Sequence, residues 1–77
     1  MNAHPTLRIP IYGLGCGGSG TTTIERELAR TPGVLRAYVN PATETAYVDY
    51  DPAQTDPDRL ARIIDRTGYR AGLAVVA

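Results

Sequence analysis

The sequence is poor in several reactive residue types. Its 77 residues include no lysine, one histidine, one methionine and one cysteine, Cys16. A single cysteine cannot form an internal disulfide, which fits a reducing compartment and leaves the thiol free for a ligand or a second chain. A cysteine nucleophile would also need a base, and the only histidine, His4, lies far from Cys16 in a leader segment. We therefore expect no enzyme built on this thiol.

Net charge and long apolar runs are absent as well. The eight arginines balance eight acidic residues, so bulk charge attracts neither nucleic acid nor an anionic membrane. No apolar run reaches the length of a membrane-spanning helix, and residues 1–5 lack the basic start and apolar segment of a signal peptide. We expect a cytoplasmic protein without nucleic-acid or membrane partners, folded as one domain over residues 1–77 with residues 1–5 as a loose leader.

A glycine-rich stretch, residues 13–20, surrounds the only thiol. Before it, Leu7, Ile9 and Ile11 alternate at the two-residue period of a half-buried strand; after it, Ile24 and Leu28 stand four residues apart on one helix face. Glycine lets a backbone approach a ligand closely, and the positive end of the following helix dipole would stabilise a thiolate. The chemistry of the chain is therefore expected in this turn.

Two helices are predicted. The first covers residues 21–30, with Thr22 and Glu25 as a capping box, Ser19 and Thr21 as rival caps, and an end at Thr31 before Pro32-Gly33. The second begins at the capping Asp56, runs from residue 57 to 67, and stops at Gly68. Its expected inner stripe is Leu60, Ile63, Ile64 and Thr67.

Four strands are predicted around these helices. Pro10 in the first strand cannot donate to a sheet ladder, which indicates an edge or a bulge there. Residues 34–40 and 45–50 alternate on either side of a turn and should form a hairpin, and the last strand should run over residues 69–76. The expected inward side chains of the hairpin are Leu35, Ala37, Val39, Ala46, Val48 and Tyr50. Tyr38 and Tyr47 should lie outward, covering each other or marking a contact surface.

The order strand, helix, strand, strand, helix, strand predicts an α+β fold. Two strand-helix-strand units with right-handed crossovers close into a four-stranded antiparallel sheet with both helices on one face. This is the ferredoxin-like βαββαβ sandwich.

Several segments then resemble one family. Val39-Asn40-Pro41-Ala42-Thr43-Glu44 resembles the V-N-x-A-T-E hairpin of the heavy-metal-associated domain, which occurs in copper chaperones and at the N-termini of copper, zinc and cadmium transporting ATPases. Pro32-Gly33-Val34, Tyr50-Asp51-Pro52 and Gly68-Tyr69-Arg70-Ala71 resemble its other motifs in the same order. The resemblance implies metal binding and metal transport as a metallochaperone, with copper(I) or another soft metal ion as cargo and a metal-transporting ATPase or other client as partner.

The metal loop departs from the family signature G-M-T-C-x-x-C, which supplies two thiolates. Here Gly13-Leu14-Gly15-Cys16-Gly17-Gly18-Ser19 places a hydroxyl, a hard and weak donor for copper(I), at the second position. Counted back from Pro32-Gly33, Cys16 lies one residue too far, so the loop holds an insertion or the cysteine is displaced. By resemblance the metal ligand is Cys16, with Ser19 and Tyr69 as candidate neighbours. Ser19 also suits a helix cap, and Tyr69 either shields the ion or packs at a strand start.

Alternatives for Cys16 stay open. Its thiolate could share an ion with Cys16 of a second chain in a metal-bridged homodimer, with glutathione, or with a client, and pass the ion on by ligand exchange without catalysis. The chain could instead be a metal-free interaction or regulatory module, or a sensor whose thiol forms a mixed disulfide. The run from Gly13 to Gly18 also reads G-x-G-x-x-G. This pattern would suggest a dinucleotide phosphate cradle. We disfavour that interpretation, because the following strands form a hairpin and so few residues cannot build a doubly wound sheet.

Overall fold

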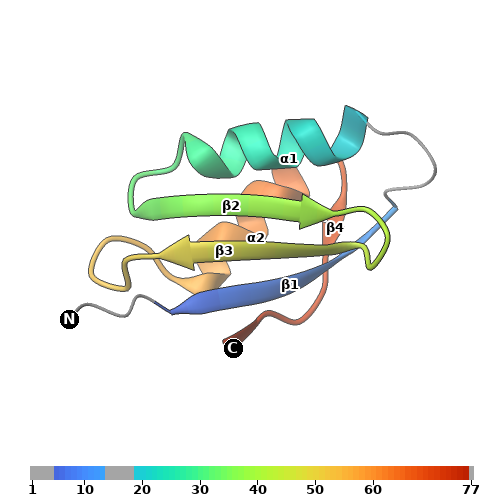
Figure 1. Cartoon of the computed structure of the whole chain (residues 1–77). Helices are drawn as coiled ribbons and strands as arrows, with labels where there is room; N and C mark the ends of the chain where they lie inside the picture. Colours follow the sequence, from blue (N-terminus) through green and yellow to red (C-terminus); the bar gives the residue numbers. More distant parts are fainter. Residues whose placement is uncertain (1–4, 14–18, 77) are drawn as a thin grey trace.

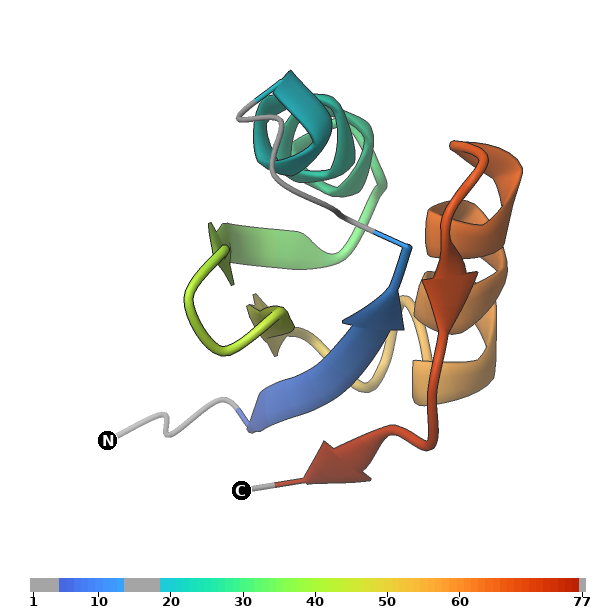
Figure 2. The ribbon, with the colours of Figure 1, turned by 90° about the vertical axis from the view of Figure 1, so that its right-hand side faces the viewer.

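The chain folds into one antiparallel sheet covered on one side by two helices (Figure 1). The computed structural model describes residues 5–13 and 19–76. The elements are β1 (Thr6–Tyr12), α1 (Ser19–Ala29), β2 (Val34–Asn40), β3 (Thr45–Tyr50), α2 (Pro57–Arg66), β4 (Arg70–Ala71) and β5 (Val75–Val76). The strand order is β2-β3-β1-β4, and β5 also pairs with β1. Figure 2 shows both helices on the same side of the sheet, so the ferredoxin-like sandwich is confirmed.

The core lies between the sheet and the helices. Its fully buried side chains come from alternate positions of β1 and β3, from Val39 of β2 and from one stripe of each helix, as the sequence predicts. They include Leu7, Ile9, Ile11, Ile24, Leu28, Val39, Val48, Leu60 and Ile64. Ala46 and Tyr50 are also buried, and Ala37 and Ile63 pack against this cluster.

Strand β2 departs from the predicted alternation at its start. Val34 pairs with Tyr50 and Arg36 with Asp49, so the register shifts between Val34 and Arg36. Such a bulge inserts one residue and moves the following side chains to the opposite face. Val34 therefore packs against the core, whereas Leu35 is 54% exposed. The prediction that Leu35 faces inward was wrong.

The last strand is divided in two, and β1 is central. β1 lies between β3 on one side and β4 with β5 on the other, so Pro10 does not mark an edge. Its carbonyl accepts a hydrogen bond from the N–H of Gly72 at 2.7 Å, but proline offers no N–H on that same side of the strand. The ladder is interrupted there, and the predicted single strand over residues 69–76 becomes two short ones.

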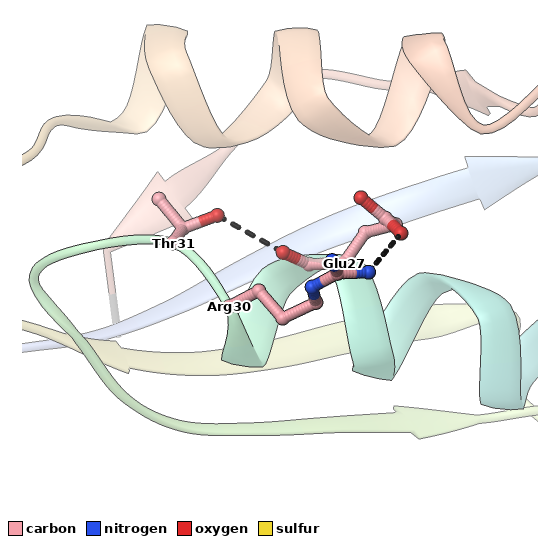
Figure 3. Close-up of polar contacts among 3 residues, drawn as sticks. All are labelled: Glu27, Arg30 and Thr31. Carbon is pink, nitrogen blue, oxygen red and sulfur yellow. Dashed lines mark hydrogen bonds and ion pairs between the residues drawn. The ribbon is translucent and has the colours of Figure 1, made fainter.

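Helix α1 starts earlier than the capping box predicted. It begins at Ser19, so Thr22 lies inside the helix and cannot be its N-cap. Glu25 does not reach back to the helix start either, because its carboxylate accepts the backbone N–H of Val39 in β2 at 2.7 Å. At the other end, the Thr31 hydroxyl donates to the Glu27 carbonyl at 3.0 Å, as Figure 3 shows.

Helix α2 matches its prediction closely. Asp56 is the N-cap and accepts from the N–H of Arg59 at 2.8 Å, Pro57 occupies the first turn, and Thr67 is the C-cap. Gly68 follows with φ +100°, the left-handed stop that glycine permits. In the part of the chain that the structure describes, no helix combines the length and apolar character needed to cross a bilayer.

Candidate metal-binding loop

The thiol-bearing segment is held at both ends by regular structure. β1 ends at Tyr12, and Gly13 turns the chain away with φ +91°, a left-handed conformation that favours glycine. Cys16 and Leu14 fall in residues 14–18, outside the described residues. The backbone resumes as helix at Ser19, whose side chain is likewise not described. The predicted ligand Cys16 and its neighbour Ser19 therefore stay predictions.

The second residue of helix α1, Gly20, faces the core. Gly20 is buried, and it stands four and eight residues before Ile24 and Leu28, which are also fully buried. These three positions form one stripe along the helix. The first N–H groups of a helix have no partner inside it and carry the positive end of its dipole. An anionic ligand of the preceding loop, such as a thiolate, is stabilised at such an end.

Tyr69 approaches the loop from the other end of the chain. It is partly buried and packs against the core cluster. A β-carbon added to Gly13 would lie 4.0 Å from Cδ1 of Tyr69, so the ring lies beside the residue at which the thiol-bearing segment begins. The packing function predicted for Tyr69 is therefore met, and its shielding of the ion or the thiolate stays a prediction.

Asp65 fixes the segment that carries Tyr69, which the sequence analysis did not foresee. Its Oδ1 accepts the backbone N–H of Ala71 at 2.9 Å, and its carbonyl accepts the N–H of Gly68 at 3.1 Å. Both ends of the segment Gly68 to Ala71 are thus tied to one residue of α2. The only sequence signal was a carboxylate three residues before a helix-ending glycine, which is too common to single out.

The described residues contain no cluster of metal-ligating side chains. Among residues 5–13 and 19–76, no three His, Cys, Asp or Glu side chains gather in a group that could hold a metal ion.

Comparison with known proteins settles the family. The profile of the family described as "Heavy-metal-associated domain" matches residues 8–70. This chain belongs to the heavy-metal-associated domain family. The family resemblance noted in the sequence is thereby confirmed.

Relatives of this heavy-metal-associated domain include parts of much larger proteins. A copper-exporting P-type ATPase of Staphylococcus aureus (strain Newman) is 40% identical over 71 residues, which are 92% of this chain but 9% of that protein. The N-terminal domain of a potential copper-translocating P-type ATPase from Bacillus subtilis, solved in its Cu(I)-loaded state, superposes with a TM-score of 0.85 at 31% identity, covering 92% of this chain and 88% of that one.

A chaperone has the same fold. The CopZ metallochaperone superposes with a TM-score of 0.82 at 24% identity, over 87% of this chain and 98% of that one. At that identity the likeness establishes the fold alone. The fold is thus shared by proteins of different size and organisation, and the fold alone does not decide among their functions.

Proposed function

We propose that this heavy-metal-associated domain binds a soft metal ion, copper(I) first of all, through the thiolate of Cys16 and passes it on by ligand exchange. The observation that carries the proposal is the place of the only thiol. It lies between Gly13 and Ser19, where β1 gives way to the N-terminus of α1, in a chain whose family is defined by heavy metals. The copper-exporting ATPase of Staphylococcus aureus and the Cu(I)-loaded domain of Bacillus subtilis support copper as the cargo.

The chemistry follows from the ligand. A thiolate is a soft donor that favours copper(I), and binding releases the thiol proton. With Ser19 at the second position, one chain offers one soft ligand, so the coordination is completed from outside: by Cys16 of a second copy, by glutathione, or by a thiol of the recipient. A recipient thiol adds to the ion while Cys16 still holds it, and the ion then leaves with the recipient as Cys16 is reprotonated.

The recipient that we propose is a metal-transporting ATPase, because the curated relatives are ATPases of which this chain spans only 9%. The reaction is a transfer between thiolates, so the domain needs no catalytic residue and is not itself an enzyme. We place it in the cytoplasm, where a lone thiol stays reduced, and assign it no nucleic-acid or membrane partner.

Native mass spectrometry of the reduced protein tests the proposal. Copper(I) is supplied from a weak competing ligand, and Cys16→Ala and Ser19→Ala are measured beside the parent protein. We expect metal uptake by the parent and by Ser19→Ala, and none by Cys16→Ala. A metal-bearing dimer would identify Cys16 of a second copy as the completing ligand. Uptake by Cys16→Ala equal to that of the parent would refute the site.

The alignment of the loop has its own test. Ser19→Cys restores the C-x-x-C spacing counted from Cys16, whereas Gly20→Cys places a thiol at the buried helix position four residues before Ile24. Only a second thiol at the correct position should let a single chain supply both ligands of the ion, so that no ligand from a second molecule is needed. A monomer with one tightly bound ion in one of the two variants identifies the register.

The role of Tyr69 can be separated by two substitutions. Tyr69→Phe keeps the ring beside Gly13, and Tyr69→Ala removes it. If the ring shields the loop, the reaction of Cys16 with a chromogenic disulfide reagent accelerates in Tyr69→Ala alone. Equal rates in all three proteins would leave Tyr69 a packing residue.

A metal-free interaction module is the second candidate, and Ser19 in place of the second thiol is the observation that favours it. Absence of metal uptake by the parent protein in the same spectra would select this candidate over the first.

A further inference from the structure

The face of the sheet opposite the helices is uncovered in the described residues, and its side chains follow from the register. Figure 2 shows both helices on the other side. Directly opposite residues of paired strands share a face. Tyr38 of β2 pairs with Tyr47 of β3, Tyr47 with Arg8 of β1, and Arg8 with Val75 of β5. One continuous row of these four side chains therefore crosses the sheet.

The two rings at the start of this row stack on each other. Their centroids are 6.3 Å apart and their planes differ by 21°, and Tyr38 is 51% exposed. The prediction that Tyr38 and Tyr47 cover each other is met, yet much of Tyr38 still faces solvent. An exposed aromatic pair on an otherwise unpartnered sheet face is a contact feature rather than a core feature.

Two hollows flank Tyr47. One of about 540 Å³ lies toward β2 and is lined by Arg36, Ala37, Tyr38, Tyr47 and Asp49. The other, of about 200 Å³, lies toward β1 and β5 and is lined by Arg8, Pro10, Thr45, Tyr47 and Val75. Each hollow combines an aromatic wall with an arginine, so the surface can accept inserted side chains on both sides of the ring.

The charge of this face is positive, although the whole chain is neutral. Arg8 and Arg36 line the hollows, and Arg70 lies opposite the outward Tyr12. Against these three arginines stands Asp49, whose Oδ1 already accepts the Thr6 hydroxyl at 2.6 Å. The acidic residues of the chain are therefore concentrated elsewhere.

We propose that this open sheet face, defined by Tyr12, Tyr38, Tyr47, Arg8, Arg36 and Arg70, docks an acidic protein surface with an apolar centre. Tyrosine and arginine are the residue types that dominate the binding energy of protein interfaces. A second copy in a symmetric pair would set the same arginines against each other, so charge disfavours that occupant. Single-stranded nucleic acid also stacks on aromatic rings, but the apolar Pro10 and Val75 that line the smaller hollow favour a protein.

Titration of the isotope-labelled full chain with a random copolymer of glutamate and tyrosine tests the surface by backbone amide NMR shifts. We expect saturable shifts at Tyr38, Tyr47 and Arg8. The double variant Tyr38→Ser with Tyr47→Ser should weaken binding about tenfold. The matched control, Arg59→Gln with Arg62→Gln, removes two exposed charges from α2 and should bind like the parent. Cys16→Ala should also bind normally, which separates this proposal from metal binding.

Four results would overturn the proposal. They are shifts confined to α1 and α2, binding that survives loss of both tyrosines unchanged, tighter binding of single-stranded oligothymidylate to the same amides, and no saturable shift with the copolymer. Far-UV circular dichroism of each variant shows whether the fold is retained. Since Tyr38 is half exposed, its replacement leaves the core intact, and the single variant Tyr38→Ser serves if the double variant unfolds.

Discussion

Glu25 should stabilise the domain through one contact between α1 and the edge of the sheet. Its Oε2 lies 2.7 Å from the backbone nitrogen of Val39, and β2 is the terminal strand in the order β2-β3-β1-β4. A hydrogen bond to a charged group contributes about 1.5–3 kcal/mol. Because the contact is only partly buried, water replaces part of it in Glu25→Ala, and we expect a loss of about 1–2 kcal/mol in the free energy of unfolding. Glu25→Gln keeps a neutral acceptor and should lose about half as much.

Two measurements check this prediction. Urea denaturation gives the free energies of unfolding, and amide hydrogen exchange reports Val39 directly, with protection falling in the order parent, Glu25→Gln, Glu25→Ala. The control is Glu27→Gln on the same helix. Glu27 pairs with Arg30 at 3.5 Å (Figure 3), and these side chains are 45% and 71% exposed, so its loss should cost about 0.5 kcal/mol or less. Equal protection of Val39 in all proteins, or an equal cost for Glu27→Gln, would refute the reasoning.

Three further substitutions test local features of the fold. Thr55 is 5% exposed, and its hydroxyl has no hydrogen-bond partner among the described residues. Thr55→Val should therefore raise the free energy of unfolding by about 1 kcal/mol in urea denaturation; a decrease would contradict this. Glu44 has φ +53°, and asparagine tolerates this left-handed region better than glutamate. Glu44→Asn should therefore stabilise the domain by about 0.5 kcal/mol and raise the midpoint of thermal unfolding. An unchanged midpoint would show that Glu44 is not strained. A β-carbon at Gly72 would lie 2.9 Å from Cε2 of Tyr12. Gly72→Ala should therefore displace the exposed Tyr12 ring and lower the free energy of unfolding by about 1 kcal/mol. Unshifted NMR resonances of the Tyr12 ring in this variant would argue against the contact.

Much of the fold could be predicted from the sequence because its strands are covered on one face. The alternation of Leu7, Ile9 and Ile11, and that of Ala46, Val48 and Tyr50, set the inner face of two strands, and all six are buried. The alternation in β2 predicted the wrong face for Leu35, because a bulge shifts which residues point inward without leaving a signal in the local sequence. Pattern reasoning finds the phase of a strand only where the strand is regular.

The site was less predictable than the fold because its supporting contacts are not local. The single thiol identified the loop as the candidate site, and the family motif identified Tyr69 as its candidate neighbour. By contrast, the Glu25 carboxylate accepts a hydrogen bond from a backbone N–H 14 residues away, and the Asp65 carboxylate accepts one from a backbone N–H six residues away. A carboxylate that accepts a backbone N–H from another element looks, in sequence, like any exposed acid on a helix, and Glu25 was accordingly assigned to a capping box.

The central strand β1 connects the two surfaces to which we assign functions. Its inward residues build the core, its outward Arg8 and Tyr12 belong to the sheet face, and its end at Gly13 opens the thiol-bearing loop. Among the described residues, Tyr12 and Gly13 join the sheet face to the start of the loop along the chain. Coupling between two sites is reciprocal. If loading Cys16 changes the affinity of the sheet face for its partner, then the partner must change the affinity for metal by the same factor, and titration of the sheet face with and without metal measures that factor.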